Sequence, residues 1–206
     1  MTGDTERSDC WRTADGDRPA DDAVRCTRFV DRYGDEWIVR PFESDDREPT
    51  LETLGAFGPE DRAMGVPPEA ASQRASWLDL LVEEGHPFVA VRDGRVGGFA
   101  VYTPTGADDP ELAVFVHPDD QERGLGTELC EHVVAAAADD DCEELVLDVT
   151  PANRTARRLY ERLGFEREDQ SAGDGLRRRT HAIRMQLPLD GPAVDEVVQH
   201  TSAIGD

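Results

Sequence analysis

Two closely spaced glycines could bring backbone N–H groups against a phosphate-bearing ligand. Gly124 and Gly126 follow an apolar run that ends at Val116, and an amphipathic run begins directly after them. Glycine allows a ligand to approach the backbone closely, and the N-terminus of a helix carries roughly half a positive charge. The spacing therefore predicts a pyrophosphate-binding loop that needs no lysine.

The glycine pair alone is weak support for this loop. Glycines that only form a turn or pack tightly give the same G-x-G spacing. The six-residue dinucleotide fingerprint does not fit, because Leu129 stands where its third glycine would fall. A second motif is needed to distinguish a phosphate-binding loop from a purely structural turn.

That second motif is the segment LDVTPANRTARRLYERLGF, residues 147 to 165. Asn153 is placed to cap a helix, and Tyr160 lies on the apolar stripe of that helix with Ala156 and Leu163. Acyl transfer from a thioester needs an oxyanion donor, a neutral amine and an acid for the departing sulfur. A phenol with a pKa near 10 stays protonated at neutral pH and can be that acid. The simpler interpretation is that Asn153 only caps the helix and that Tyr160 only packs in the core.

Together the two motifs resemble the signatures of the GNAT N-acetyltransferase superfamily. The loop gives Q-x-x-G-x-G, and the later segment gives N-x-x-A-x-x-x-Y followed by G-F, in the same order as in that superfamily. The resemblance covers residues 36 to 188. It implies an α/β (mixed α+β) fold with a single, mostly antiparallel mixed sheet flanked by helices. It also implies an acyl-CoA loop at a strand-to-helix junction and acetyl-CoA as the co-substrate, with no metal.

The resemblance further implies roles for individual residues. Backbone groups of Phe115 and Val116, on a strand splayed from its neighbour, would bond the pantetheine amides and polarise the thioester carbonyl. Asn153 would touch the cofactor arm, and Tyr160 would both contact the cofactor and protonate the CoA thiolate. The expected pyrophosphate-binding loop consists of Gln121, Arg123, Gly124, Leu125, Gly126 and Thr127.

Three other side chains could take part in the chemistry. Glu111 begins the strand that leads to the loop and could relay the amine proton through water, or be a solvated strand-end carboxylate. His117 could compete for that role, although a histidine before a loop proline is usually structural. Cys130 lies one residue off the stripe of its helix, which favours packing over a ping-pong nucleophile.

The net charge of the chain indicates the salt concentration in which the protein works rather than the charge of its substrate. The formal net charge is −23, and every one of the 22 basic residues is arginine. Molar salt screens such self-repulsion, and the composition resembles that of proteins from organisms with a salt-rich cytoplasm. A docking surface for a basic partner is the alternative, but the acids are spread along the whole chain. Nucleic-acid binding is not expected without a basic face.

The remaining composition points to a cytoplasmic protein. The N-terminus has no secretory pattern, and no apolar run approaches the ~20 residues of a membrane span. The four cysteines form no CxxC pair, which favours free thiols, and the scattered histidines predict no metal site. The expected partners are a small-molecule or peptide amine acceptor and a second copy of the chain in a homodimer, with no nucleic acid and no membrane.

The chain divides into one domain and two tails. Residues 1 to 25 are expected to be an acidic disordered tail, 26 to 188 the acetyltransferase domain with its core at 36 to 188, and 189 to 206 an acidic C-terminal tail. The expected strands are a hairpin around Tyr33-Gly34-Asp35, a hairpin around Asp93-Gly94, and single strands at 111 to 116, 144 to 149 and near 180 to 189. Helices are expected over 43 to 58, from Pro67-Pro68 to Glu84, after Gly126, and from Asn153 to Gly164.

These observations predict an N-acetyltransferase that moves the acetyl group of acetyl-CoA to a primary amine by direct attack in a ternary complex. The alternative from another class is a non-catalytic acyl-CoA-binding sensor, which could dispense with Tyr160. Glu122 and the preceding Asp119-Asp120 depart from the family loop by placing acidic side chains beside a polyanionic ligand. The stretches 55 to 68 and 167 to 178, which would line the acceptor site, match no acceptor pattern, so the sequence leaves the acceptor open.

Overall fold

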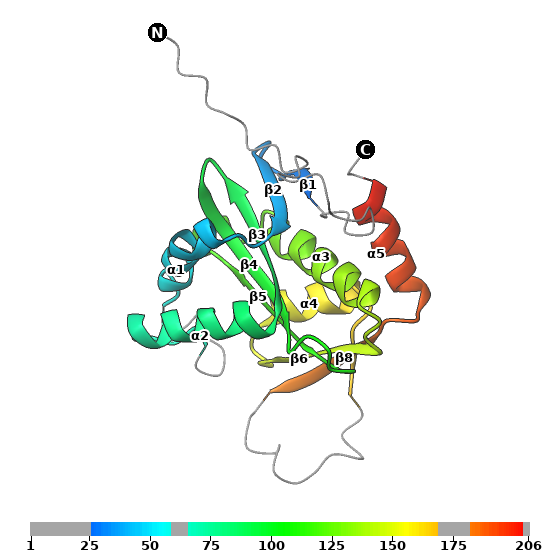
Figure 1. The fold of residues 1–206 in the computed structure, drawn as a ribbon. Helices are drawn as coiled ribbons and strands as arrows, with labels where there is room; N and C mark the ends of the chain where they lie inside the picture. Colours follow the sequence, from blue (N-terminus) through cyan, green and yellow to red (C-terminus); the bar gives the residue numbers. More distant parts are fainter. Residues whose placement is uncertain (1–25, 59–65, 169–181, 204–206) are drawn as a thin grey trace, which may run out of the picture.

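An eight-stranded sheet runs through the computed structural model, which describes residues 26–58, 66–168 and 182–203 (Figure 1). The strand order is β1-β2-β3-β4-β5-β6-β8-β7, and only β5 and β6 run parallel to each other. The strands are β1 Thr27–Val30, β2 Glu36–Pro41, β3 His86–Arg92, β4 Arg95–Thr103, β5 Glu111–Val116, β6 Glu144–Val149, β7 Glu166–Arg167 and β8 Ile183–Pro188. The single mixed, mostly antiparallel sheet predicted from the sequence is confirmed.

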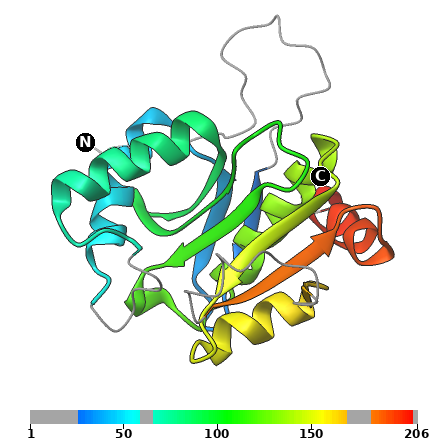
Figure 2. The same ribbon diagram turned by 90° about the horizontal axis from the view of Figure 1, so that it is seen from below.

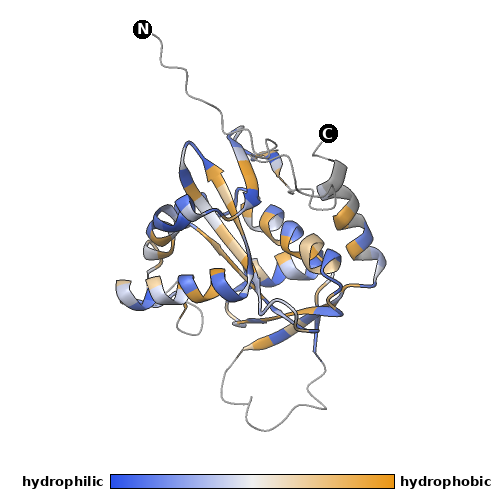
Figure 3. Cartoon of the chain, in the orientation of Figure 1, coloured by the Kyte–Doolittle hydropathy of each residue, from blue (hydrophilic) through white to orange (hydrophobic). Residues whose placement is uncertain are grey.

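Helices cover both faces of this sheet (Figures 1 and 2). Buried residues of α1 (Arg47–Gly55) and α2 (Ala71–Glu84) share one apolar cluster, whereas those of α3, α4 and α5 share another. The second group comprises α3 Leu125–Asp139, α4 Arg154–Arg162 and α5 Pro192–Ala203. The described residues also form two short 3₁₀ turns, η1 Ser44–Asp46 and η2 Pro118–Asp120. The result is a three-layer arrangement with apolar strands at its centre (Figure 3).

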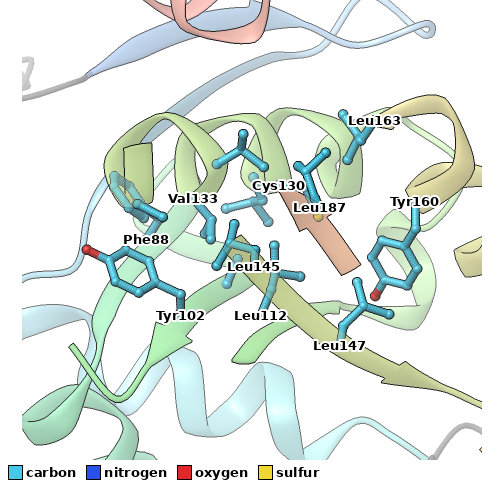
Figure 4. Close-up of a cluster of buried hydrophobic side chains, with 14 of the residues drawn as sticks. Phe88, Tyr102, Leu112, Cys130, Val133, Leu145, Leu147, Tyr160, Leu163 and Leu187 are labelled. Atoms are coloured by element: carbon cyan, nitrogen blue, oxygen red, sulfur yellow. The ribbon is translucent and has the colours of Figure 1, made fainter. Parts of the chain in front are cut away.

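Alternation along β4 builds both clusters. Phe99 and Val101 face the α1–α2 side, and Ala100 and Tyr102 face the α3 side, because successive side chains of a strand point to opposite faces. All four are fully buried. The α3 cluster is the larger, and Figure 4 shows its core around Val133, Leu145 and Leu187.

Most of the elements expected from the sequence are present. The two hairpins turn at Gly34 and at Asp93-Gly94, where positive φ angles explain the turn residues. The predicted stripe of α3 is fully buried, and Gly164 ends α4 with φ of +94°. β7 was not expected, and α2 begins at Ala71, three residues beyond Pro68.

Two expectations need correction. An acidic tail was expected from residue 189, but Pro192–Ala203 form α5, because Val194, Val197 and Val198 at helical spacing pack against the α3 cluster. Free thiols were expected, but Cys26 is disulfide-bonded, whereas Cys130 and Cys142 are free. The expected tail at residues 1–25 lies outside the described residues.

The packing of β4 gives a first prediction, at Gly97. A Cβ on Gly97 would overlap the ring of Trp37, which is fully buried and hydrogen-bonded. We expect Gly97→Ala to lower the free energy of unfolding by about 1–3 kcal/mol, the usual cost of overpacking a core. Gly191→Ala is the control, because its Cβ would be 3.8 Å from the nearest atom. Denaturant unfolding in molar KCl measures both, and equal stability of the two variants would contradict this account.

Candidate functional site

The parallel strands β5 and β6 separate almost as soon as they meet. Their one registered pair is Glu111 with Val146, and the Val146 N–H donates to the Pro110 carbonyl at 3.1 Å. β4, on the other side of β5, stays paired with it along its whole length. The remainder of β5 therefore turns one backbone edge toward a splayed opening, as the family resemblance implied.

The antiparallel alternation decides which β5 groups face the opening. The His117 N–H donates to the Gly97 carbonyl at 2.9 Å, so the odd-numbered residues 111 to 117 direct their backbone groups toward β4. The groups of Val114 and Val116 then face β6. Phe115, expected from the sequence to bond a ligand through its backbone, has those groups directed at β4 by this alternation.

A row of unpaired N–H groups lies at the end of β5. The chain passes through η2 into α3, with positive φ at Glu122 (+58°) and Gly124 (+105°). Within the described residues, none of the five consecutive N–H groups of residues 122 to 126 donates a hydrogen bond, whereas the Thr127 N–H is used by the Gly124 carbonyl at 2.9 Å. We call these five groups the amide row. Together with the α3 N-terminus, they form a concentrated donor site for an anion.

The two glycines of this loop have different structural roles. Gly124 needs its positive φ, and a Cβ there would meet the Phe29 ring at 3.2 Å. Gly126 needs neither, because a Cβ would meet Val116 at 3.6 Å and Leu159 at 4.0 Å, which are ordinary contacts. A side chain at Gly126 would project between β5 and α4, where the splayed strands open. The absence of that side chain leaves room for a ligand.

The loop side chains turn away from the amide row. Gln121 donates from Nε2 to the Val116 carbonyl at 3.3 Å. Arg123 donates from Nη1 to Asp31 and to Asp35, each at 2.8 Å. The sequence suggested both side chains as pyrophosphate contacts, but in this structure each is engaged with protein. The backbone N–H of Arg123 is still part of the amide row.

Helix α4 brings the second motif to the same opening. Asn153 caps it by accepting a hydrogen bond from the Ala156 N–H at 3.0 Å, which leaves its amide N–H₂ to donate. The Tyr160 ring is 7% exposed and packs against Phe165 in the α3 cluster, and Figure 4 shows it reaching from α4 toward the sheet. No hydrogen bond to its hydroxyl exists within the described residues. Burial, with a smaller contribution from Cys130, raises the pKa of Tyr160 above its ordinary value.

Two other sequence candidates have structural roles here. Cys130 is fully buried in the α3 cluster, and burial raises the pKa of its thiol, so a reactive thiolate is disfavoured (Figure 4). His117 caps η2, because its Nδ1 accepts from the Asp119 N–H at 3.2 Å. Both findings agree with the plainer interpretation of these residues.

Glu111 lies at the closed end of the splay, apart from the loop. Val116 lies five positions further along the strand, a distance of about 16 Å. Partial burial and then the negative charge of Asp148 raise its pKa, against a smaller opposite effect of Arg184. A carboxyl with a raised pKa at the edge of a cleft is a better proton acceptor than an ordinary one.

Sequence reasoning missed an aromatic wall on the other face of β5. The Phe115 ring makes edge-to-face contacts with Phe57 of the α1–α2 connection, at 6.0 Å between centroids, and with Trp77 of α2, at 5.4 Å. Only the helical spacing of Phe57 and Trp77 within their own segments was visible in the sequence. Their meeting on one strand depends on the packing of α1 and α2 against the sheet.

Two other kinds of feature, a metal-binding cluster and a membrane-spanning helix, are absent from the described residues. No group of three or more His, Cys, Asp or Glu side chains among them is arranged to hold a metal ion. None of the helices in the described ranges is long and apolar enough to cross a membrane.

Known proteins give an independent comparison. Residues 44–165 match the family model of the acetyltransferase (GNAT) family. The L-amino acid N-acyltransferase MnaT of Escherichia coli (strain K12) is 30% identical over 128 residues, which cover 58% of this chain and 74% of MnaT. The crystal structure of the GNAT domain of S. lividans PAT superposes with a TM-score of 0.65 at 22% identity, covering 84% of this chain and 99% of that domain. yncA from Salmonella typhimurium, solved with its cofactor acetyl-CoA, superposes with a TM-score of 0.56 at 22% identity, covering 74% of this chain and 94% of yncA.

The geometry of the loop predicts a sharp effect of a side chain at Gly126. We expect Gly126→Val to fold normally and to weaken acetyl-CoA binding by about tenfold or more, because a branched side chain would fill the space beside the amide row. Gly124→Ala is the contrasting variant, because it should lower the melting temperature through its strained φ. Titration calorimetry and thermal melts check both, and unchanged affinity in folded Gly126→Val would exclude this binding mode.

Proposed function

Because the chain belongs to the GNAT acetyltransferase family, a family of acyltransferases, we propose that it transfers the acetyl group of acetyl-CoA to a primary amine by direct attack in a ternary complex. The observation that carries this proposal is the amide row at the mouth of the β5–β6 splay. Five free donors at a helix N-terminus suit a pyrophosphate, and the free edge of β5 suits an amide-bearing arm. Acetyl-CoA has both groups in that order.

In the proposed complex, the chain's backbone does most of the binding. The amide row holds the pyrophosphate, and the Asn153 side-chain amide donates to the cofactor arm. Val114 and Val116 then pair with the pantetheine amides in the manner of an added strand, and a β5 N–H in the splay polarises the thioester carbonyl. These donors are fixed by the strand and the helix, so they need no rearrangement as negative charge develops on the carbonyl oxygen.

Tyr160 is the proposed donor to the departing sulfur. When the amine nitrogen bonds to the acetyl carbon and the C–S bond breaks, the electron pair goes to sulfur. The pKa of Tyr160 is raised by burial, whereas a thiol has a pKa of about 8.5, so the phenol stays protonated throughout. Tyr160 therefore stabilises the thiolate chiefly by donating a hydrogen bond, and solvent supplies the final proton.

The attacking amine has to lose its proton. Glu111, whose raised pKa favours proton uptake, is the proposed acceptor, through an intervening water. A water chain without Glu111 is the alternative. A covalent intermediate on Cys130 is not part of the proposal, because that thiol is buried and its pKa is raised.

The first acceptors to test are L-amino acids, since MnaT is named for its action on them. The wall of Phe57, Trp77 and Phe115 suits an acceptor with an apolar part beside its amine. The experiment is a thiol-release assay with acetyl-CoA in molar KCl over L-amino acids, peptide N-termini and small amines. Binding of acetyl-CoA without thiol release over the whole panel would favour the sensor instead. A cytoplasm rich in salt is the setting we propose for the activity.

The role of Tyr160 gives a prediction that separates enzyme from sensor. Tyr160→Phe keeps the ring packed against Phe165 and removes only the hydroxyl. We expect kcat to fall by about 10²-fold or more while acetyl-CoA affinity changes little. Tyr102→Phe is the matched control, because it removes a buried hydroxyl that donates to Asp140 beyond the C-terminal end of α3. A Tyr160→Phe protein of native melting temperature that turns over within threefold of wild type would remove Tyr160 from the mechanism.

The net charge predicts an unusual salt dependence of binding. Salt weakens the attraction between phosphates and the amide row, but it also screens repulsion between a polyanionic ligand and a chain of charge −23. The guanidinium group of Arg123, the basic residue of this loop, is engaged with Asp31 and Asp35, so we expect the second effect to dominate. The affinity for acetyl-CoA should rise from 0.1 M to 2 M KCl. Calorimetry at salt concentrations where circular dichroism is constant measures it, and a steady fall in affinity would show that local attraction dominates.

A further inference from the structure

The loop that forms the amide row is held from outside by the β1–β2 hairpin. The Arg123 side chain reaches Asp31 and Asp35 at 2.8 Å each, and its guanidinium lies 4.8 Å from the centroid of the Tyr33 ring. The neighbouring Glu122 pairs with Arg32 at 3.3 Å. Two consecutive loop residues are therefore bonded to one hairpin turn about 90 residues earlier in the chain.

Asp31 is built to receive Arg123. Its side chain is 0% exposed and accepts four hydrogen bonds, from the Tyr33 and Asp35 N–H groups, from Trp37 Nε1 and from Arg123. Burial alone would raise the pKa of Asp31, but these hydrogen bonds, that of Arg123 first, outweigh it and hold the pKa well below its usual range. Asp31 is therefore a buried carboxylate for which Arg123 is a charged partner.

The same bonding extends along the loop to η2. Asp120, also buried, accepts two hydrogen bonds from Arg95, at 2.6 and 2.9 Å, and Arg92 pairs with Asp35. The guanidinium groups of Arg92 and Arg95 both lie over the Trp37 ring, at 5.7 and 5.6 Å from its centroid. We call the set the arginine–carboxylate brace, and its members are Asp31, Asp35, Arg92, Arg95, Asp120 and Arg123.

We propose that Arg123 is a positioning residue, which the brace uses to hold the amide row in its binding conformation, and that its guanidinium does not bind the phosphates. The proposal rests on the proposed coenzyme site. Glu122 and Gly124 both have positive φ, which is costly at Glu122, and the brace holds Asp120 before this turn and Arg123 within it. Asp31 and Asp35 lie outside residues 44–165, the range that matches the family model, whereas the other four members of the brace lie within it.

A direct phosphate contact by Arg123 is disfavoured by the same geometry. To reach a ligand, the guanidinium would have to leave Asp31, whose side chain has no access to water, and Asp35 as well. A buried carboxylate without its charged partner is strongly unfavourable. The N–H groups of the amide row, in contrast, break no bond when they bind an anion.

A double-mutant cycle distinguishes the two roles. The variants are Arg123→Met, Asp31→Asn and the double variant, and the probe is acetyl-CoA in titration calorimetry. If the brace positions the loop, each single variant should bind about tenfold more weakly, and the double variant should bind no more weakly than either. If Arg123 is a phosphate ligand, Asp31→Asn should bind as tightly as wild type or more tightly, because the arginine is released, and the proposal is overturned.

A second readout separates loop positioning from general damage. Acetyl-pantetheine carries the thioester but no phosphate, so its kcat/KM should be unchanged in Arg123→Met, whereas KM for acetyl-CoA should rise about tenfold. Equal losses with both substrates would mean that the variant is merely misfolded or mispacked, which contradicts the proposal. Asp35→Ser, at a partly exposed partner of Arg123, tests the same point if Asp31→Asn fails to fold.

Arg28→Met is the matched control, because it removes an arginine–carboxylate pair with Glu36 from the same hairpin without touching the loop. It should bind acetyl-CoA like wild type. Failure of the proposed function would look different from failure of the brace. Wild-type protein that binds no acetyl-CoA removes both, whereas wild-type binding that every brace variant retains removes only the brace.

Discussion

The rest of the site depends on one constraint, which is that a strand must satisfy its backbone groups or leave them for a ligand. β5 keeps its full ladder with β4 and loses β6 after Glu111, so one edge of the strand is left open. At its end the chain turns into α3 through a loop whose five N–H groups also have no partner in the described residues. Two adjoining sets of unpaired donors therefore lie one after the other, and this is the path that we propose for acetyl-CoA. The α4 helix, with Asn153 and Tyr160, closes its side.

Local residue types were enough to predict much of this arrangement. The glycines of the loop, the cap at Asn153, and the apolar stripes of α3 and α4 act within a few residues of themselves, and the structure has each of them where the pattern put it. Family resemblance added the single, mostly antiparallel sheet and the splay. Which β5 backbone groups face the splay depends on the hydrogen-bond pattern between β4 and β5. The sequence does not reveal this pattern, so it suggested Phe115, whereas in the structure the backbone groups of Val114 face the splay.

Contacts between distant segments could not be predicted in the same way. Arg123 stands in a loop that would suit a phosphate-binding arginine, and only the position of the β1–β2 hairpin reveals that its partners are Asp31 and Asp35. The aromatic wall has the same origin, because Phe57 and Trp77 meet at Phe115 through helix packing. The C-terminal helix was hidden by its acidic residues, although three valines at helical spacing were present in the sequence.

The acidity of the chain takes on a local meaning at the loop. Asp119, Asp120 and Glu122 beside a polyanion look unfavourable in the sequence, yet Asp120 is bonded to Arg95 and Glu122 to Arg32. Arginine suits this arrangement better than lysine, because its planar fork bonds a carboxylate at two points and stacks on Trp37 or Tyr33. In a chain whose basic residues are all arginine, the buried carboxylates of Asp31 and Asp120 are each paired with a guanidinium group.

β5 also explains how one strand can serve two substrates. Its backbone edge, through Val114 and Val116, faces the splay, while the side chain of Phe115 points to the α1–α2 face, where Phe57 and Trp77 complete the wall. Because the pleat separates these directions, the proposed coenzyme side depends on backbone groups, whereas the proposed acceptor side depends on side chains. Under this proposal, a change of side chain in α1 or α2 alters the acceptor side and leaves the backbone groups of the coenzyme side as they are. This division accounts for a loop and a helix cap that the sequence displays plainly and an acceptor that it does not.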